Sequence, residues 1–178
     1  MIRGRTAPFV LALVLGAAPA CAPDESSVGS VLGAGEGLAA AYFAGRDFQR
    51  PSGVYQDANI DFDGWQLNDL VQARGHFAHT VSIRWTGQIW LEDPGSYTLF
   101  FELRGRVRLW VGDALIIDDW VDSGDLREPR GTIAGGGWRN LRVEWDQIDG
   151  PMTARLSAAS PPRDKTVVPP DDLRHGAP

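Results

Sequence analysis

The sequence has a single cysteine in 178 residues, so no disulfide can form within the chain. It also has little of the spacing typical of amphipathic helices, and only residues 67–77 could hold a helical turn or two. The formal net charge is −6 and the basic residues form no block, which argues against a nucleic-acid partner. The fold therefore depends on a hydrophobic core, which a chain of this length can build in one domain.

A hydrophobic run long enough to cross a membrane is also missing from the N-terminal segment. The apolar run over residues 9–16 is too short to span a bilayer. Two arginines precede it, and the small residues Ala18-Pro19-Ala20 follow it as a cleavage site. We therefore predict that residues 1–20 are a signal peptide and that the protein is exported.

Cys21 directly follows this cleavage site, and an unpaired thiol in an exported chain needs an explanation. Its position resembles the lipobox of bacterial lipoproteins, in which this cysteine becomes the lipidated N-terminus. Ala18 stands where that pattern usually has leucine, and the alternative is ordinary cleavage with an incidental or intermolecular thiol. By the same resemblance, Ala22 in place of aspartate favours the outer membrane of the bacterial cell envelope.

The rest of the chain divides into a spacer, one domain and a tail. Residues 21–36 contain the predicted lipidated cysteine and then small, polar, glycine-rich residues typical of a flexible tether. Residues 37–173 are predicted to form the domain, and residues 174–178 a tail.

Signatures of catalysis are missing as well. The sequence has no nucleophile elbow, zinc signature or phosphate loop. Acidic residues are plentiful, but nothing selects a pair of carboxylates of the kind that glycosidases use. We therefore expect a protein that is not an enzyme and that carries no cofactor.

What the sequence does have is alternating apolar residues between sharp turn signals, together with seven Trp and 21 Gly. The alternating segments are residues 81–85, 97–103, 107–111 and 114–117, followed later by 138–146 and 152–158. Asp93-Pro94-Gly95 is a turn sequence between the first two of these segments, and Gly112-Asp113 is one between the third and the fourth. The pattern predicts an all-β antiparallel sandwich in a single domain, with a tight antiparallel meander over residues 81–117.

Several short sequence motifs, taken in their order along the chain, resemble those of one protein family. They are Gly37-Leu38 with Tyr42-Phe43, Ile60-Asp61-Phe62, Arg84-Trp85-Thr86-Gly87, Pro94-Gly95-Ser96-Tyr97-Thr98, Val107 to Val111, Leu115 to Asp118 with Trp120, Leu141 to Trp145, and Val168-Pro169 before Leu173. This order is similar to the lectin-like domain of the anthrax toxin protective antigen, which also occurs in bacterial β-glucosidases and in yeast flocculins and adhesins. The resemblance implies a twisted antiparallel β-sandwich and an accessory, non-catalytic binding role.

The resemblance also implies where a calcium site would lie. The adhesin branch holds calcium with two adjacent aspartates before the strand that corresponds to residues 107–109, but Arg104-Gly105-Arg106 stands at those positions here. Calcium needs oxygen ligands, and two cationic side chains are electrostatically unsuited to it. The paired-aspartate motif is missing, so we do not expect calcium-dependent sugar binding of the adhesin type.

Two groups of charged residues remain as candidates for ligand binding. An acidic cluster surrounds an aromatic ring that could stack on a sugar, and arginines alternate along the preceding strand. The candidate residues are Arg104, Arg106, Asp113, Asp118, Asp119, Trp120 and Asp122. The alternatives are a solvated loop with the Trp120 ring packed in the core, and arginines that pair with acids on neighbouring strands.

Two functions follow from these features. The first is a lipid-anchored, non-catalytic cell-surface module that binds a cell-surface or extracellular glycan. The second is a structural or protein-interaction module of the cell envelope, with an envelope protein as its partner and no sugar site. No nucleic acid is expected as a partner of either.

Overall fold

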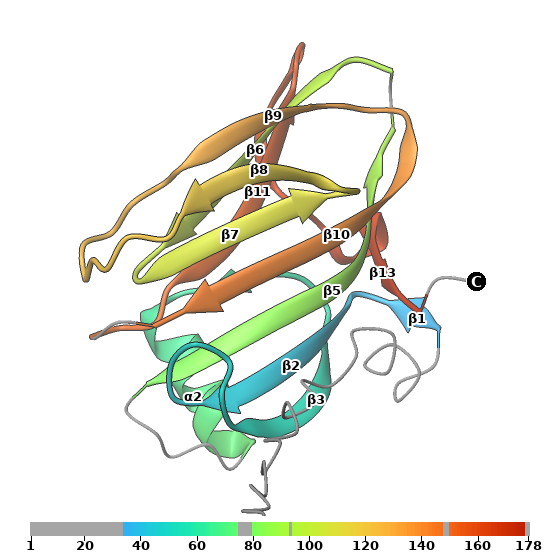
Figure 1. The fold of residues 1–178 in the computed structure, drawn as a ribbon. Coiled ribbons are helices and arrows are strands. Elements are labelled where there is room, and N and C mark those ends of the chain that lie inside the picture. The colour runs from blue at the N-terminus through green and yellow to red at the C-terminus, as the bar shows by residue number, and fades with distance from the viewer. Residues whose placement is uncertain (1–33, 75–79, 93, 148–149, 177–178) are drawn as a thin grey trace, which may run out of the picture.

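The computed structural model describes residues 34–74, 80–92, 94–147 and 150–176 and shows two antiparallel sheets packed face to face (Figure 1). The all-β sandwich predicted from the sequence is confirmed. The strands of the larger sheet are β1 (Gly35–Glu36), β2 (Leu38–Ala44), β3 (Pro51–Asp57), β5 (Val81–Leu91), β7 (Arg106–Val111), β8 (Ala114–Asp119), β10 (Gly137–Asp146) and β13 (Leu173–His175). Those of the smaller sheet are β4 (Asp61–Phe62), β6 (Ser96–Leu103), β9 (Arg130–Ala134), β11 (Ala154–Ser160) and β12 (Arg163–Val167).

The strand order places β5 and β10 in the middle of the larger sheet (Figure 1). The order is β1-β13-β5-β10-β7-β8, and β2 joins the same edge of β5 as β13 and carries β3 on its other side. In the smaller sheet the order is β12-β11-β6-β9, with β4 paired to β11. Strand β5 therefore runs through the molecule from one end of the sandwich to the other.

The core lies between the two sheets and is built from the alternating residues that the sequence analysis identified. In strands, side chains point alternately to opposite faces, so every second residue of a half-buried strand is inside. The residues that meet in the core are Val81, Ile83 and Trp85 of β5, Val107, Leu109 and Val111 of β7, Leu141, Val143 and Trp145 of β10, Tyr97, Leu99, Phe101 and Leu103 of β6, and Ala154 and Leu156 of β11. The prediction that alternating apolar residues of β5, β7 and β10 form a buried face is confirmed.

The pairing of strands differs from the meander predicted over residues 81–117. Strand β5 pairs with β2, β10 and β13, whereas β6 lies in the other sheet and pairs with β9 and β11. The β7–β8 hairpin is the part of the meander that the structure confirms. Both sheets of a sandwich show the same alternation, so the pattern indicates which side chains are buried but not which strand lies alongside. The first residue of the predicted Asp93-Pro94-Gly95 turn lies outside the described residues.

Gly35–Glu36, predicted as part of the tether, form the edge strand β1, and β13 extends two residues into the predicted tail. Strands β9 and β12 were not predicted either. Both lie at edges of the smaller sheet, and every residue of β12 except Val167 is exposed. Backbone hydrogen bonds to β6 and β11 hold these strands in place, and Ile133 of β9 is their one side chain packed against the core cluster, so the apolar alternation that reveals a strand in a sequence is weak.

The helical content is small, as expected. Helix α2 (Gly64–Ala73) lies near the predicted helical residues 67–77, and a short 3-10 helix, η1 (Pro170–Asp172), precedes β13. Residues 75–79 are outside the described part of the chain, as is Cys21 with the predicted signal peptide. No helix in the described residues has both the length and the apolar character needed to cross a membrane.

A buried carboxylate ties the first strands to the core. Asp57 is 3% exposed and accepts hydrogen bonds from the Tyr42 hydroxyl at 3.0 Å, from Trp85 Nε1 at 2.7 Å and from Arg74 Nη2 at 2.8 Å. Burial, followed by the Asp57 charge, raises the pKa of Tyr42 above its ordinary value. Because buried carboxylates need such partners, this cluster is structural.

Candidate functional site

Most of the predicted site residues gather at one end of the sandwich, which we call the loop end and define as residues 45–50, 104–106, 120–126 and 146–147. The side chain of Arg106 is at its centre and is 10% exposed. Its guanidinium contacts Asp47 Oδ1 at 2.7 Å and Asp122 Oδ1 at 3.3 Å, and it pairs closely with Asp146. One cationic group therefore serves three carboxylates.

Asp146 is the deepest of these carboxylates, with no exposed side-chain surface. Its Oδ2 also accepts the backbone N–H of Asp47 at 3.2 Å and lies 3.8 Å from Arg46 Nε. Asp47 and Phe48 have positive φ values of 59° and 55°, so the chain turns here through the left-handed region. The Oδ1 atom of Asp146 is buried and has no hydrogen-bond partner among the described residues. The charge on Arg106 is therefore needed to keep this carboxylate inside the fold.

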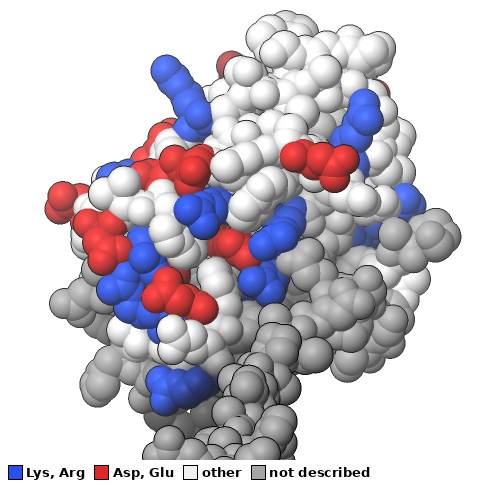
Figure 2. Space-filling view, viewed as in Figure 1, with Lys and Arg blue, Asp and Glu red and all other residues white. Residues whose placement is uncertain are grey.

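The Arg106 side chain remains a cation in this setting. Burial lowers the pKa of Arg106, but its hydrogen bonds to Asp146 and Asp47 outweigh burial, so the pKa lies above its ordinary value. Arg46 adds a second cation, with Nη2 2.7 Å from Asp122 Oδ1. Figure 2 shows acidic and basic side chains interleaved on the part of the surface where β7 begins and β10 ends.

The ring of Trp120 is half-buried and packed on by three neighbours. Arg106 and Arg108 place their guanidinium carbons 4.4 and 4.8 Å from the ring centroid. Phe48 stacks against it at a centroid distance of 6.1 Å and an interplanar angle of 28°. Trp120 therefore packs among side chains of the loop end rather than in the core between the sheets.

The remaining acidic and basic candidates of this region are also paired. Asp118 contacts Arg108 at 3.0 Å, and Asp119 pairs closely with Arg127. Arg104 donates from Nη1 to the carbonyl of Gly124 at 2.6 Å. The cross-strand pairing that the sequence left as an alternative is thus present for Arg108 of β7 and Asp118 of β8.

Asp113 does not lie with the other candidates. It occupies the β7–β8 hairpin at the opposite end of these strands and lines a shallow hollow with Trp110, Asn140 and Arg142. Neither an ion pair nor a hydrogen bond joins its side chain to a described residue. Asp113 is close in sequence to the acidic cluster, but strand β8 lies between them and places Asp113 at the opposite end of the sheet from the loop end.

Three carboxylates of the loop end are already paired with cationic side chains. In the part of the chain that the structure describes, no three side chains of His, Cys, Asp or Glu are arranged to hold a metal ion. A guanidinium lies among the carboxylates of Asp47, Asp122 and Asp146, so a protein cation already compensates their charge. A ligand binding here would have to compete with these ion pairs.

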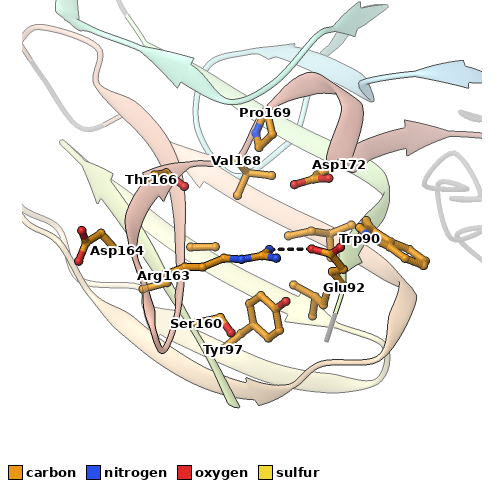
Figure 3. Close-up of a pocket in the computed structure, with 14 residues that line it drawn as sticks. Trp90, Glu92, Tyr97, Ser160, Arg163, Asp164, Thr166, Val168, Pro169 and Asp172 are labelled. Atoms are coloured by element: carbon orange, nitrogen blue, oxygen red, sulfur yellow. Dashed lines mark ion pairs between the residues drawn. The ribbon is translucent and has the colours of Figure 1, made fainter. Parts of the chain in front are cut away.

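A different arrangement occurs at the other end of β5, where a cavity of about 240 Å³ opens between the sheets (Figure 3). We call it the inter-sheet cavity. Its floor is apolar and includes Leu91, Tyr97 and Val168, all of them buried. Its rim is polar, with Glu92 and Arg163 on opposite sides. Arg163 extends across the opening and its Nη1 contacts Glu92 Oε2 at 2.7 Å (Figure 3).

Asp172 lies on the same rim, at the end of η1, close to Glu92 (Figure 3). Its carboxylate accepts no hydrogen bond from any described residue. Burial raises the pKa of Asp172 above 3.8, the charges of Asp171 and Glu92 raise it further, and Arg163 opposes them. The carboxyl group is thus partly desolvated without a donor of its own.

These rim residues were not predicted as site residues. Glu92 and Arg163 are 71 positions apart, and Arg163 and Asp172 lie near the end of the predicted domain. No motif signals them, because they are brought together by the pairing of β12 with β11 and by the return of the chain through η1. The apolar motif Val168-Pro169 was the available sequence signal that this C-terminal segment packs against the rest of the domain.

The two packed sheets define an all-β sandwich domain, and comparison with known proteins identifies its family. The family model of the PA14 domain matches residues 35–172, and the chain belongs to this family. This confirms the resemblance to the lectin-like domain of the protective antigen and the adhesins.

Of three relatives that share the domain, two are larger proteins than this chain. The anti-sigma-I factor RsgI3 of Acetivibrio thermocellus is 30% identical over 142 residues, which are 79% of this chain and 22% of that protein. An anti-sigma factor domain-containing protein of known structure has a TM-score of 0.70 at 28% identity, over 78% of this chain and 47% of that chain. The PA14 sugar-binding domain of an RTX adhesin has a TM-score of 0.61 at 13% identity, over 79% of this chain and 99% of that chain. This chain thus spans about a fifth of the curated relative and about half of the first structure.

Proposed function

We propose that this protein is an exported, lipid-anchored, non-catalytic module of the bacterial cell envelope that binds carbohydrate in the inter-sheet cavity. The observation that carries the proposal is the cavity itself, in which a buried apolar floor faces a polar rim. A pyranose ring has a face of C–H groups and a rim of hydroxyls, so it matches both surfaces. The volume of about 240 Å³ is smaller than pockets for drug-sized ligands and suits one sugar ring.

The rim supplies the hydrogen bonds that a sugar needs. The carboxylates of Asp172 and Glu92 accept from hydroxyl groups, and the Arg163 guanidinium donates to hydroxyl or ring oxygens. The side chains of Glu92 and Arg163 are 54% and 60% exposed, so their ion pair is worth at most about 1 kcal/mol. A sugar can therefore replace that contact at little cost and give Asp172 the donor that it lacks.

The comparisons support a binding role at the level of the domain. The RTX adhesin domain is described as sugar-binding, and its likeness to this chain at 13% identity concerns the fold. The choice of a sugar as ligand therefore rests on the cavity.

The direct test is calorimetric titration of the full chain carrying Cys21→Ser with glucose, galactose, mannose, xylose and N-acetylglucosamine. We expect at least one of these sugars to bind, and Asp172→Asn to weaken it about tenfold or more, because a charged acceptor is lost. Asp171→Asn is the matched control, since its side chain is exposed and does not line the cavity. Failure of all five sugars to bind, or equal loss in both variants, would contradict the proposal.

The lipid anchor has its own test. We expect the unaltered protein to sediment with outer membranes, and Cys21→Ser to release it into the soluble fraction. Continued tight membrane association of the variant would rule out anchoring through a lipid on this residue.

A second candidate function is interaction with an envelope protein. The observation that favours it is the loop after β8, in which Val121 and Leu126 are 60% and 52% exposed. This alternative predicts that cross-linking in membrane fractions captures one protein through this loop, that Val121→Ser with Leu126→Ser abolishes the capture, and that no sugar binds.

A further inference from the structure

The outer face of the larger sheet carries a second group of aromatic side chains, which adjoins the inter-sheet cavity only through Trp90 (Figure 3). Three tryptophans, Trp90 of β5, Trp138 of β10 and Trp110 of β7, point to the same side of three neighbouring strands. The register pairs Trp138 with Trp90 and Arg142 with Trp110, and residues 138, 140 and 142 share one face because side chains alternate along a strand. That face is turned away from the core, since Leu141 and Val143 are buried on the other side.

Two hollows lie in a row on this face, each walled by one of the tryptophans. The first, of about 430 Å³, is lined by Trp110, Asp113 and Asn140. The second, of about 470 Å³, is lined by Trp138 and Arg174. We call this surface, with the ridge between the two hollows, the outer platform.

Arginine side chains hold both rings in place. Arg142 lies 4.6 Å from the ring centroid of Trp110, and Arg174 lies 4.1 Å from that of Trp138. Trp138 also contacts Trp90 at 5.4 Å with an interplanar angle of 52°. Both rings are half-buried, so each is fixed from one side and keeps some surface open. Fixed rings lose little conformational entropy when a ligand stacks on them.

The ridge between the hollows is polar and only partly satisfied. Gln88 Nε2 donates to Asn140 Oδ1 at 3.0 Å, and Gln88 Oε1 accepts from Arg174 Nε at 2.7 Å. The amino group of Asn140 therefore has no acceptor among the described residues, and the Asp113 carboxylate beyond it has no donor. A surface of rings alternating with open amide and carboxylate groups suits hydroxyl-rich rings better than the apolar core of a protein interface.

The span of the platform indicates a chain of sugars. Trp138 and the partner of Trp110, Arg142, are four residues apart on β10, which corresponds to about 13 Å along the strand. One sugar ring cannot contact both tryptophans across this distance. We infer that the outer platform binds an extended linear polysaccharide, with one sugar stacked at Trp110 and another at Trp138, separately from the single ring proposed for the cavity.

The test uses the full chain with Cys21→Ser and four probes: cellohexaose, xylohexaose, mannohexaose and hexagalacturonate, each compared with its monosaccharide. We expect at least one hexasaccharide to bind more tightly than its monomer, and Trp110→Ala and Trp138→Ala each to weaken it by about tenfold through loss of a stacking surface. Trp120→Ala, at the loop end, is the matched control and should leave this affinity unchanged. Trp138→Phe should restore most of the binding, which separates stacking from a folding defect.

The outcomes also separate this inference from the proposed function. If the platform is correct and the cavity is not, hexasaccharide binding survives in Asp172→Asn and fails in the two tryptophan variants. Binding of monomer and hexamer with equal affinity, parental affinity in both tryptophan variants, or binding of none of the hexasaccharides would overturn the inference.

Discussion

The two ends of the sandwich use polar side chains in opposite ways. At the loop end, Asp47, Asp122 and Asp146 all lie around the guanidinium of Arg106. At the cavity end, Asp172 has no hydrogen-bond donor among the described residues, and the pair of Glu92 with Arg163 is exposed. The end richer in charge is thus the one with less capacity left for a ligand.

This difference shows why a dense cluster of acidic and aromatic residues is a poor indicator of a binding site. Charged side chains that satisfy one another stabilise a loop, and a ligand has to break those contacts before it gains any. An acceptor held in a cavity without a donor has already lost part of its hydration, so a ligand that donates to it gains the full interaction. What matters is whether an unsatisfied group can be reached by a ligand. Asp146 Oδ1 also lacks a partner among the described residues, but its side chain is fully buried, whereas Asp172 lines the cavity.

The largest expected effect concerns the buried ion pairs of the loop end. Arg106→Ala should lower the free energy of unfolding by about 3–5 kcal/mol, because it leaves the fully buried Asp146 carboxylate without its principal partner. Urea unfolding followed by tryptophan fluorescence measures this. Arg108→Ala is the control on the same strand: its pair with Asp118 is 37% and 50% exposed and should contribute about 1 kcal/mol or less. Similar losses in the two variants would mean that the loop end is not held by its buried pair.

A smaller loss is expected from Arg127→Ala. Besides its pair with Asp119, Arg127 donates from Nη2 to the carbonyls of Gly105 at 2.6 Å and Val121 at 3.1 Å. Its removal should cost about 1–3 kcal/mol of unfolding free energy, because partly buried acceptors lose their donor. Proteolysis should then cut the segment 120–126 faster than in the parent. Arg130→Ala, three residues further on, should change neither measurement.

The strands of the sandwich show how far the sequence predicts the fold. Alternation in segments such as residues 107–111 identifies the buried faces, because burial of every second residue is a local property of a strand. Pairing across the sandwich is not local, and this is why the meander from β5 to β6 was predicted wrongly. The ion pair of Arg108 on β7 with Asp118 on β8 was foreseen as an alternative, because a hairpin places the two residues opposite each other.

The site could be predicted less well than the fold. Arg106, Trp120 and Asp122 do lie together, since the segments that carry them are close in sequence. Glu92 and Asp172 belong to segments that meet only through the C-terminal return of the chain, and no spacing rule connects them. A cavity is a property of packing, so its lining residues need no characteristic pattern.

At the cavity end, removal of a charge should have little effect on stability. Arg163→Ala breaks an ion pair whose side chains are more than half exposed, so the unfolding free energy should fall by about 1 kcal/mol at most. The same urea experiment measures it. A loss as large as that of Arg106→Ala would contradict the contrast between the two ends.

The smallest expected effect is a pH dependence caused by Asp172. Its pKa in the folded protein is raised above 3.8, first by burial and then by Asp171 and Glu92. The window lies between the ordinary pKa of an aspartate in the unfolded chain and the raised pKa of Asp172 in the folded protein. Within it the folded state binds more protons at this group than the unfolded chain does, so the free energy of unfolding falls as the pH rises. Unfolding measured from about pH 3 to about pH 6 should show this fall in the parent, part of it in Asp171→Asn, and none of this contribution in Asp172→Asn. An unchanged profile in Asp172→Asn would contradict the assignment.

The central claim is that the sugar site lies at the cavity end and not at the loop end. Calorimetric titration of the Cys21→Ser chain with the tightest-binding monosaccharide, repeated for Asp172→Asn and for Asp122→Asn, tests it most directly. We predict a loss of about tenfold or more for Asp172→Asn and the parental affinity for Asp122→Asn, whose side chain is 56% exposed and already paired with Arg46. Loss of binding in Asp122→Asn with parental affinity in Asp172→Asn would contradict the account and place the ligand at the loop end.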